Sequence, residues 1–416
     1  GPLCFLVLGF FFGYMIVAHV LLPLYYKLNL TSIYGYLGTR IGVHTYRTGS
    51  FFFLLSRMLG TAAKLYLVCL ILHTHVFQEM HIPFWVIAVG SVTLVWIYTH
   101  KSGIKTIVWT DTLQTFCLIA ALLFIIYFTI QKLDTGFDGI VQTIRNSEHS
   151  RIFVFDDWIS RQNFFKQFFS GIFIVIVMTG LDQDMMQKNL SCRNLREAKK
   201  NMYCYGFSFI PLNFLFLCLG ILLLALAGQM QLELPAMNDD ILPMFATQGY
   251  LGHSVLILFT IGIIAAAFSN SDSALTAMTT SVCIDLLNTE KDTEEVARRK
   301  RKRVHLLLSV LLAFFICLVE MLNNKSVIDA IYIIASYTYG PLLGMFAFGL
   351  FTRRQTNDRL VPLIAIASPV LCYALDWWIS KETGYKFGYE LLMLNGSLTF
   401  AGIMLLSGKE KAVKTP

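Results

Sequence analysis

Long apolar runs dominate this chain and limit what it can fold into. Eleven of them follow one another, at about 3–25, 50–73, 83–99, 106–131, 167–187, 202–228, 251–285, 304–322, 327–352, 358–379 and 390–407. A helix that crosses a bilayer needs roughly 20 mostly apolar residues. Of the 416 residues, 56% are hydrophobic and 14% are charged, whereas soluble domains carry about 25% charged residues. The sequence therefore predicts an all-α membrane protein with about 11 transmembrane helices, and it excludes a soluble globule, a disulfide scaffold and a nucleic-acid-binding domain.

The basic residues lie mostly in alternate loops between these runs. The richer set of loops includes Lys27 to Arg47, Lys188 to Lys200, Arg298 to Arg303 and the tail from Lys409. Because cytoplasmic loops carry an excess of Lys and Arg, we expect this set and the C-terminus to be cytoplasmic. The run 292–303 is then a solvated helix that touches anionic headgroups. This topology starts the chain on the outer side, and we expect one or more helices to precede residue 1.

Motifs of catalysis and metal binding are absent from the sequence. It contains no HExxH, no GxSxG and no Gly-rich phosphate loop, so nothing indicates an enzyme. The cysteines lie mostly in apolar runs without CxxC spacing, which is typical of buried small side chains. His73, His75 and His81 share one short loop, but their spacing matches no strong metal signature.

Two basic residues, Arg57 and Lys64, lie inside one apolar run. A charge at mid-bilayer costs about 2.5–3.5 kcal/mol on insertion scales, so each one needs a reason. Because they are two helical turns apart, they share one helix face. Two interpretations stay open: both pair with internal carboxylates, or at least one faces a solute cavity and meets an anionic group.

Carboxylates also occur at membrane depth. Asp111, beside Thr110 and Gln114, offers the hard oxygen ligands that sodium prefers; the alternative is a partner for Lys64 or Arg57. Asp182, Gln183 and Asp184 follow Gly180, which is expected to break its helix near the cytoplasmic side; the fragment is MTGLDQDMMQKNL. For Asp184 we expect solvation at the membrane interface.

A polar stripe runs along the segment GIIAAAFSNSDSALTAMTTSVCIDLL. Its members follow helical spacing and are Ala266, Ser269, Ser273, Thr276 and Thr280. Asp272 falls beside this stripe. A line of hydroxyls with one carboxylate fits a monovalent-cation site, and a packing face of small residues fits the same pattern. Both interpretations stay open.

Three stretches of the chain resemble the sodium:solute symporter family. They are LLPLYYKLNLTSIYGYLGTRIG, THKSGIKTIVWTDTLQTF and the Ser- and Asp-rich segment 261–285. The resemblance implies a LeuT-type inverted-repeat helical bundle. It also implies one transporter domain over 1–416, with core helices two to ten at about 1–352, two additional helices at about 358–407 and a short cytoplasmic tail. The first core helix would be missing, in agreement with the topology argument.

The resemblance further implies two sodium sites. The six matching positions are Ala266, Ser269, Asn270, Asp111, Asp272 and Ser273. The first three match the site shared by the family, with Ala266 acting through its carbonyl, although members usually carry a hydroxyl where Asn270 stands. The last three match a second site of some members, in which hydroxyls stand at the positions of Asp272 and Ser273. Sodium is then the coupling ion, and no other cofactor is implied.

The solute is less well defined by the resemblance. Sugar-transporting relatives carry a carboxylate in the second core helix, and residues 3–18 contain none. Sialic-acid-transporting relatives carry an Arg in the third core helix, which here holds Arg57. We therefore expect symport of an anionic organic solute such as a sialic acid or carboxylate, with a sodium/sugar symporter as the alternative and a channel or transporter-fold sensor disfavoured. The residues predicted to line the solute cavity are Arg57, Lys64, Thr179, Gln183, Ser336 and Tyr339.

The expected setting is the bacterial inner membrane, where the lipid bilayer surrounds the helices. The expected ligands are a small organic solute and sodium. No obligate protein partner is evident from the sequence.

Overall fold

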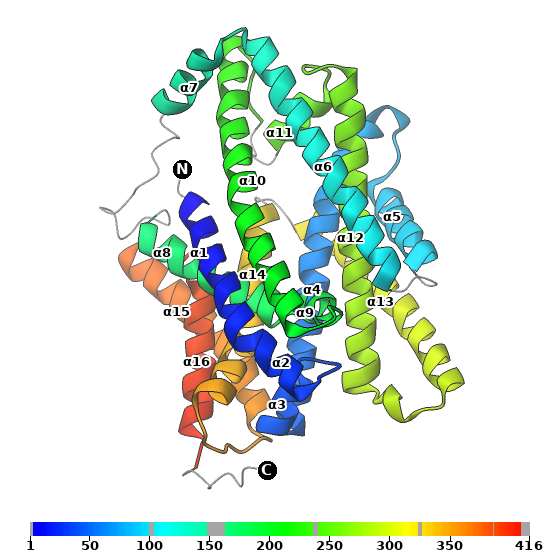
Figure 1. The fold of residues 1–416 in the computed structure, drawn as a ribbon, viewed down its shortest axis with the longest axis vertical. Coiled ribbons are helices and arrows are strands. Elements are labelled where there is room, and N and C mark those ends of the chain that lie inside the picture. The colour runs from blue at the N-terminus through cyan, green and yellow to red at the C-terminus, as the bar shows by residue number, and fades with distance from the viewer. Residues whose placement is uncertain are drawn as a thin grey trace.

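The computed structural model describes residues 3–99, 104–147, 163–235, 240–322, 327–385 and 387–408. Within these residues the fold is helical, and a single bridge between Thr356 and Ser407 is the only β-type pairing. The helices are α1 (Leu3–Ile16), α2 (Leu22–Leu28), α3 (Gly35–Arg40), α4 (Val43–Ile71), α5 (Phe84–Thr99), α6 (Ile104–Leu133), α7 (Phe137–Asn146), α8 (Phe164–Val175), α9 (Gln183–Leu190), α10 (Leu195–Gln229), α11 (Ile241–Thr247), α12 (His253–Ser281), α13 (Glu294–Leu322), α14 (Val327–Phe351), α15 (Val361–Thr383) and α16 (Leu391–Leu405) (Figure 1).

Membrane-spanning helices account for most of this architecture. The described residues contain eight helices that are long and apolar enough to cross a bilayer. A further pair, Phe164–Gly180 and Gln183–Leu190, meets this test only together and is bent by 66°. Two shorter apolar helices, Phe84–Ile97 and Leu391–Leu405, complete the set. These elements match the eleven apolar runs, so the expected all-α membrane architecture is confirmed.

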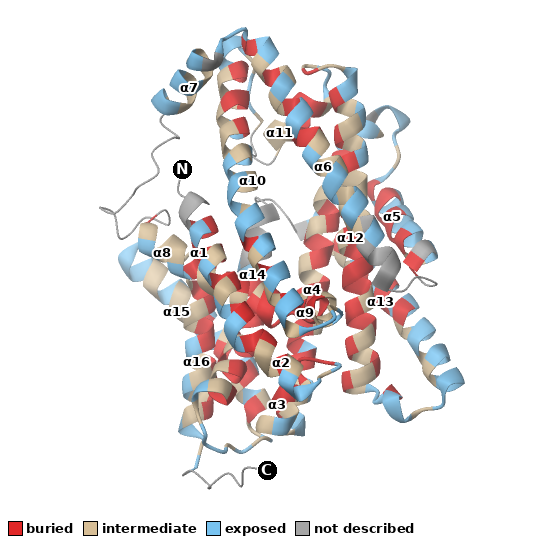
Figure 2. Ribbon diagram, viewed as in Figure 1, coloured by how far each residue is buried: buried red, intermediate tan, exposed pale blue. Residues whose placement is uncertain are grey.

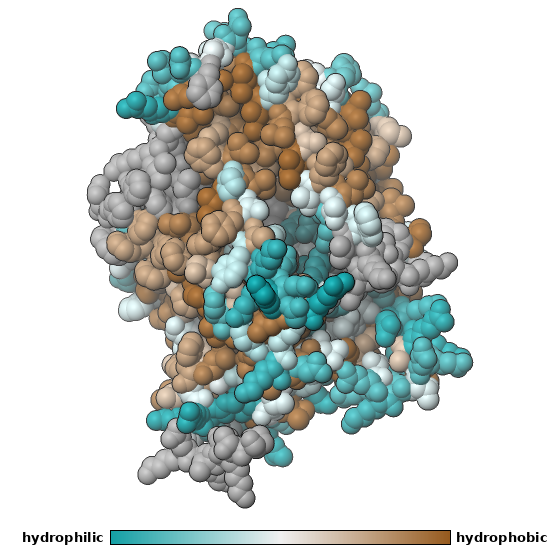
Figure 3. Space-filling model, viewed as in Figure 1, coloured by the Kyte–Doolittle hydropathy of each residue, from teal (hydrophilic) through white to brown (hydrophobic). Residues whose placement is uncertain are grey.

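Two apolar cores hold the bundle together. The larger one joins α1, α4 and α14 and includes Val17, Phe53 and Leu342. The smaller one, with Leu222 and Phe245 among its members, lies among α6, α10, α11 and the start of α12. Buried residues concentrate around α4, α9 and α14, and the outer helices expose much of their surface (Figure 2). Apolar side chains cover large parts of one face, while hydrophilic ones gather at its two ends and over α9 (Figure 3).

Helices α1 and α8 cross with their backbones in close contact. A Cβ atom on Gly9 would stand 2.2 Å from the carbonyl oxygen of Phe168, and one on Gly171 would stand 2.3 Å from that of Leu6. Only glycine fits at both positions, in the way that small residues let membrane helices approach. This crossing fixes α8, the first half of the broken span from which the candidate site is built.

Helix α4, which carries Arg57 and Lys64, is anchored at its start by the loop after α14. Asp358 in this loop accepts hydrogen bonds from the backbone N–H groups of His44 and Thr45, each at 2.8 Å, and from the Thr45 hydroxyl at 2.6 Å. Burial raises the pKa of Asp358, but these hydrogen bonds outweigh burial and hold the pKa below its ordinary value. The carboxylate therefore caps the helix as a charged group.

Candidate functional site

A break in one membrane span brings polar side chains into the bundle. After α8 the chain makes a π-helical turn, Ile176–Gly180, and then bends into α9. The carbonyl groups freed at the bend accept hydrogen bonds from the Tyr25 hydroxyl, at Gly180, and the Tyr34 hydroxyl, at Leu181, each at 2.9 Å. Such irregular backbone is tolerated at membrane depth only when it is satisfied inside the protein.

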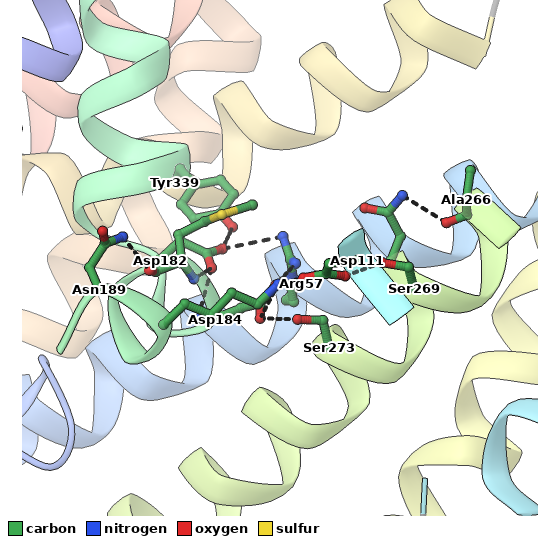
Figure 4. Close-up of polar contacts among 12 residues, drawn as sticks. Arg57, Asp111, Asp182, Asp184, Asn189, Ala266, Ser269, Ser273 and Tyr339 are labelled. Atoms are coloured by element: carbon green, nitrogen blue, oxygen red, sulfur yellow. Dashed lines mark hydrogen bonds and ion pairs between the residues drawn. The ribbon is translucent and has the colours of Figure 1, made fainter. Parts of the chain in front are cut away.

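Asp182 begins the second half of this span as a helix cap. One of its carboxylate oxygens accepts hydrogen bonds from the backbone N–H groups of Asp184, at 3.0 Å, and Met185, at 3.3 Å. The other oxygen accepts the Tyr339 hydroxyl at 2.6 Å and lies 3.6 Å from a guanidinium nitrogen of Arg57. Because the cap fixes the direction of the chain, Asp184 also points towards Arg57 (Figure 4).

Arg57 forms a buried ion pair with Asp184. The guanidinium group donates to one carboxylate oxygen of Asp184, and the other oxygen accepts the hydroxyl of Ser273 at 2.5 Å. Arg57 is 8% exposed and Asp184 is 3% exposed. The first interpretation of Arg57, a partner of internal carboxylates, thus describes the structure.

The expectation that Asp184 is solvated at the membrane interface is wrong. The 66° bend turns α9 inward, so that Asp184 meets α4 and α12 instead of water. The same bend places Lys188, which we expected among the cytoplasmic loop charges, one helical turn further along α9 and against Asp111 of α6.

Asp111 joins the polar stripe of α12. One of its carboxylate oxygens accepts a hydrogen bond from the Ser269 hydroxyl, and the other lies 2.8 Å from the ammonium nitrogen of Lys188. Asp111 therefore contacts α12 through Ser269, whereas the resemblance grouped Asp111 with Asp272 and Ser273 and placed Ser269 in the other site. The sequence suggests Lys64 or Arg57 as the cation paired with Asp111. In the structure this cation is Lys188.

The remaining residues of the two expected sodium sites lie along α12. The Asn270 side chain donates to the carbonyl of Ala266 at 2.9 Å, one turn earlier. Ser273 faces Asp184, whereas the resemblance grouped it with Asp111. Asp272 is fully buried between Ser271 and Ser273. The stripe is thus divided, with Ser269 bonded to Asp111 and Ser273 bonded to Asp184.

Lys64 lies beside a small cavity next to this network. The cavity, of about 20 Å³, is lined by Arg57, Thr61, Lys64, Met178, Ala335 and Tyr339, among others. Within the part of the chain that the structure describes, the ammonium group of Lys64 makes no hydrogen bond or ion pair. Arg57, Lys64 and Tyr339, three of the residues predicted to line the solute cavity, therefore share one cavity, and their role in solute binding stays a prediction.

Three other predicted cavity residues serve different contacts. The Gln183 side chain accepts a hydrogen bond from the backbone of Ile33 and donates one to that of Thr31, each at 3.0 Å. The carbonyl of Ser336 accepts a bond from Asn395, also at 3.0 Å. Thr179 is nearly buried in the π-helical turn. The structure does not place these three residues on the cavity.

Three residues of the network, Asp182, Asp184 and Lys188, are absent from the predicted site. Asp182 follows the helix-breaking Gly180, and an Asp at such a place is a frequent helix cap. Lys188 stands four residues after Asp184, the spacing of a helical ion pair, and its ammonium lies 4.0 Å from the Asp184 carboxylate. Both signals were present in the sequence.

A broken span, buried carboxylates at the start of α9 and on α12, and a cavity beside them are typical of a secondary transporter, since such proteins bind ions and solutes where helices are interrupted. The chain belongs to the sodium:solute symporter family, whose model matches residues 3–359. It is a multi-pass integral membrane protein of a family of transporters, not of enzymes, and sodium is the coupling ion of this family.

Two curated relatives illustrate the similarity. The chain is 27% identical, over 406 aligned residues, to the sodium/sialic acid symporter NanT of Aliivibrio fischeri, covering 91% of this chain and 75% of the relative. It is 28% identical over 364 residues to the sodium-dependent multivitamin transporter of Oryctolagus cuniculus, covering 83% of this chain and 55% of that protein. The chain therefore spans about three quarters of one relative and about half of the other.

The fold agrees with a solved transporter structure. A sodium-coupled sialic acid symporter in a substrate-bound, outward-open state superimposes with a TM-score of 0.80 at 21% sequence identity, covering 97% of this chain and 82% of that one. The expected LeuT-type helical bundle is confirmed by this match.

Proposed function

We propose that this chain carries out sodium-driven symport of a small anionic organic solute by alternating access. The observation that carries the anionic assignment is Lys64, which lines a cavity at membrane depth and forms no direct hydrogen bond or ion pair with another residue that the structure describes. A charge in this position is costly unless it meets an opposite charge. A carboxylate on the solute supplies that charge. The sialic acid named for NanT, the bacterial relative, belongs to this chemical class.

The sodium ligands are proposed around Asp111 and Ser269. Direct contacts join two cationic side chains, Arg57 and Lys188, to three carboxylates, those of Asp111, Asp182 and Asp184. This network therefore holds one negative charge in excess, and a monovalent cation neutralises it. Oxygen atoms from a carboxylate and hydroxyls are suitable ligands for a hard cation. The carbonyl of Ala266 and the side chains of Asn270, Asp272 and Ser273 remain further candidate ligands on α12.

The solute is proposed to bind where the cavity meets α4 and α14. Lys64 and Arg57 of α4 and Tyr339 of α14 line this cavity, and Lys64 is the residue proposed to face the solute carboxylate. Sodium drives transport only if it binds the outward-facing state more tightly than the inward-facing state. Asp111 on α6, Ser269 on α12 and Lys188 on the broken span lie on three separate elements, so a relative movement of these helices changes the sodium affinity.

The proposed setting is a bacterial inner membrane with the C-terminus in the cytoplasm. The alternation of basic loops in the sequence supports this orientation, and the bacterial origin of NanT supports the membrane. Residues 1–416 act as one transporter domain in this proposal.

Uptake into liposomes tests the function. The full-length protein is reconstituted, and uptake of radiolabelled sialic acid, a simple monocarboxylate and a neutral hexose is measured with an inward sodium gradient or with choline in its place. We expect uptake of an acid only with sodium. Lys64→Gln should reduce that uptake at least tenfold, and Lys64→Arg should retain more of it because the charge is kept. Uptake that ignores sodium contradicts the coupling, and uptake of the hexose alone contradicts the anionic assignment.

A further inference from the structure

Lys188 pairs with Asp111, the carboxylate proposed above as a sodium ligand. Its ammonium nitrogen lies 2.8 Å from one carboxylate oxygen, and the Ser269 hydroxyl donates to the other. Both oxygens of this carboxylate are therefore engaged. A sodium ion carries the same charge as the ammonium group and prefers the same kind of oxygen atoms.

The ion pair of Lys188 and Asp111 is more accessible than the neighbouring pair of Arg57 and Asp184. The side chains of Lys188 and Asp111 are 29% and 32% exposed, whereas those of Arg57 and Asp184 are 10% and 4% exposed. Ion pairs contribute less free energy as their exposure rises, so separating Lys188 from Asp111 costs less than separating Arg57 from Asp184. Hydrophilic side chains also gather over α9 in the space-filling view, which gives a displaced ammonium group a polar environment (Figure 3).

Asp184 cannot hold Lys188 as an equal second partner. The Lys188 ammonium lies 4.0 Å from one carboxylate oxygen of Asp184. That oxygen already accepts the Ser273 hydroxyl, and the other oxygen is paired with Arg57. When Lys188 leaves Asp111, it therefore turns towards its exposed side.

We propose that Lys188 is a tethered competitor of sodium: its ammonium group holds the Asp111 site when sodium is absent, and sodium binding displaces it. This inference rests on the proposed function, because it takes Asp111 as a sodium ligand. Lys188 then sets the sodium concentration at which the carrier loads, and it keeps the empty site from remaining an unpaired carboxylate.

Sodium alone is the probe for the first test. The purified full-length protein is titrated with NaCl at constant ionic strength, with choline chloride as the balancing salt, and thermal stabilisation is recorded. We expect Lys188→Met and Lys188→Gln to lower the half-saturating sodium concentration by about 5-fold to 150-fold, the usual range of coupling between two bound groups. Lys188→Arg should stay close to the wild type. Lys300→Met is the matched control, since Lys300 pairs with Asp292 at the same 2.8 Å outside the site.

The second test needs no variant and covers the case in which substitution at Lys188 prevents folding. The wild-type protein is treated briefly with acetic anhydride, and acetylation of Lys188 is compared with that of Lys300 by peptide mass spectrometry. We expect sodium, but not choline, to raise the labelling of Lys188 severalfold and to leave that of Lys300 unchanged.

The outcomes separate this inference from the proposed function. An unchanged or raised half-saturating concentration in both neutral variants, with sodium response lost in Asp111→Asn, overturns the competition and leaves Asp111 as a sodium ligand. An Asp111→Asn protein that responds like the wild type overturns both the ligand and its competitor, while sodium-driven uptake is judged independently in liposomes. Labelling of Lys188 that ignores sodium also overturns the displacement.

Discussion

The two halves of α12 are built in opposite ways. The first half is apolar and only partly buried: Val255 and Phe259 pack into the smaller core, while Ile257 and Ile261 are 57% and 50% exposed. In the second half, from about residue 267, most side chains are buried although many are polar, including Ser269 and Ser273. The polar half therefore lies inside the bundle and part of the apolar half faces outward.

Polar residues inside and apolar residues outside are the reverse of a water-soluble protein, and the surrounding lipid explains the difference. Lipid tails are as apolar as Leu or Ile side chains, so an outward Ile gains little from being covered. Hydroxyls and carboxylates find no partners in lipid and turn towards one another inside the protein. Stability and function are consequently both concentrated in the second half of α12 and the helices that it meets, and substitutions on either half test this division.

Removing Arg57, whose partner Asp184 is hydrogen-bonded to the polar half of α12, should have the largest effect. In Arg57→Met, the carboxylates of Asp182 and Asp184 stay buried without their partner, which typically costs about 3–5 kcal/mol. We expect little folded protein by size-exclusion chromatography and no uptake. Arg57→Lys keeps the charge and should fold better; a stable Arg57→Met protein with normal uptake contradicts the role assigned to the ion pair.

Truncating one apolar residue in each half gives a direct comparison. Leu275 is fully buried in the second half and Ile261 is half exposed in the first. Leu275→Ala should lower the free energy of unfolding by about 2–5 kcal/mol because it opens a cavity. Ile261→Ala should cost less than about 0.5 kcal/mol, as a surface change does. Thermal unfolding in detergent measures both variants, and equal losses would remove the distinction between the halves.

A smaller effect is expected when one hydroxyl of the polar half is lost. Ser269→Ala removes the hydrogen bond to Asp111, and bonds to charged groups contribute about 1.5–3 kcal/mol. The half-saturating sodium concentration for uptake should rise about tenfold. Ser309→Ala is the control, because Ser309 is also buried and its hydroxyl donates to the carbonyl of His305 in its own helix. An unchanged sodium requirement in Ser269→Ala excludes Ser269 from the sodium site.

The smallest effect concerns a carboxylate outside the membrane. Hydrogen bonds outweigh burial and hold the pKa of Asp358 below its unfolded value of about 3.9. Its contribution to stability is therefore present above that value and is lost as the pH falls through the lower folded pKa. Asp358→Asn should be slightly less stable at pH 7 and should lose less stability on acidification below about pH 4. Thermal unfolding from pH 7 to pH 3 measures this, and parallel curves contradict the expectation.

Much of the fold was predictable because lipid imposes a simple rule. Each of the eleven apolar runs became a helix, a bent pair or a short apolar helix, since only backbone that satisfies itself survives in a bilayer. The polar face of α12 was also predictable from helical spacing. The resemblance brought Asp111 to this helix, although it grouped Asp111 with Asp272 and Ser273 and not with Ser269.

The arrangement around α9 was not predictable from periodicity. Gly180 indicated a break, but the size and direction of the bend depend on the hydroxyls of Tyr25 and Tyr34, which come from a distant part of the chain. Without knowledge of the bend, the sequence indicates an interfacial position for Asp184 and a loop position for Lys188. Similarly, Gln183 looked available for a solute, whereas its amide ties α9 to residues 31 and 33.

The separation of charge within the site has an electrical consequence. Among the described side chains that contact one another around Arg57, three carboxylates meet two cations, and Lys64 carries a further positive charge beside the neighbouring cavity. Loading one sodium ion and one monovalent anion therefore leaves the formal charge of the site unchanged. Membrane voltage performs about 2.3 kcal/mol of work per elementary charge per 100 mV, so with this load it acts equally on the full and the empty carrier. The concentration gradients of sodium and solute would then set the direction of transport, and a second sodium ion would make transport sensitive to voltage.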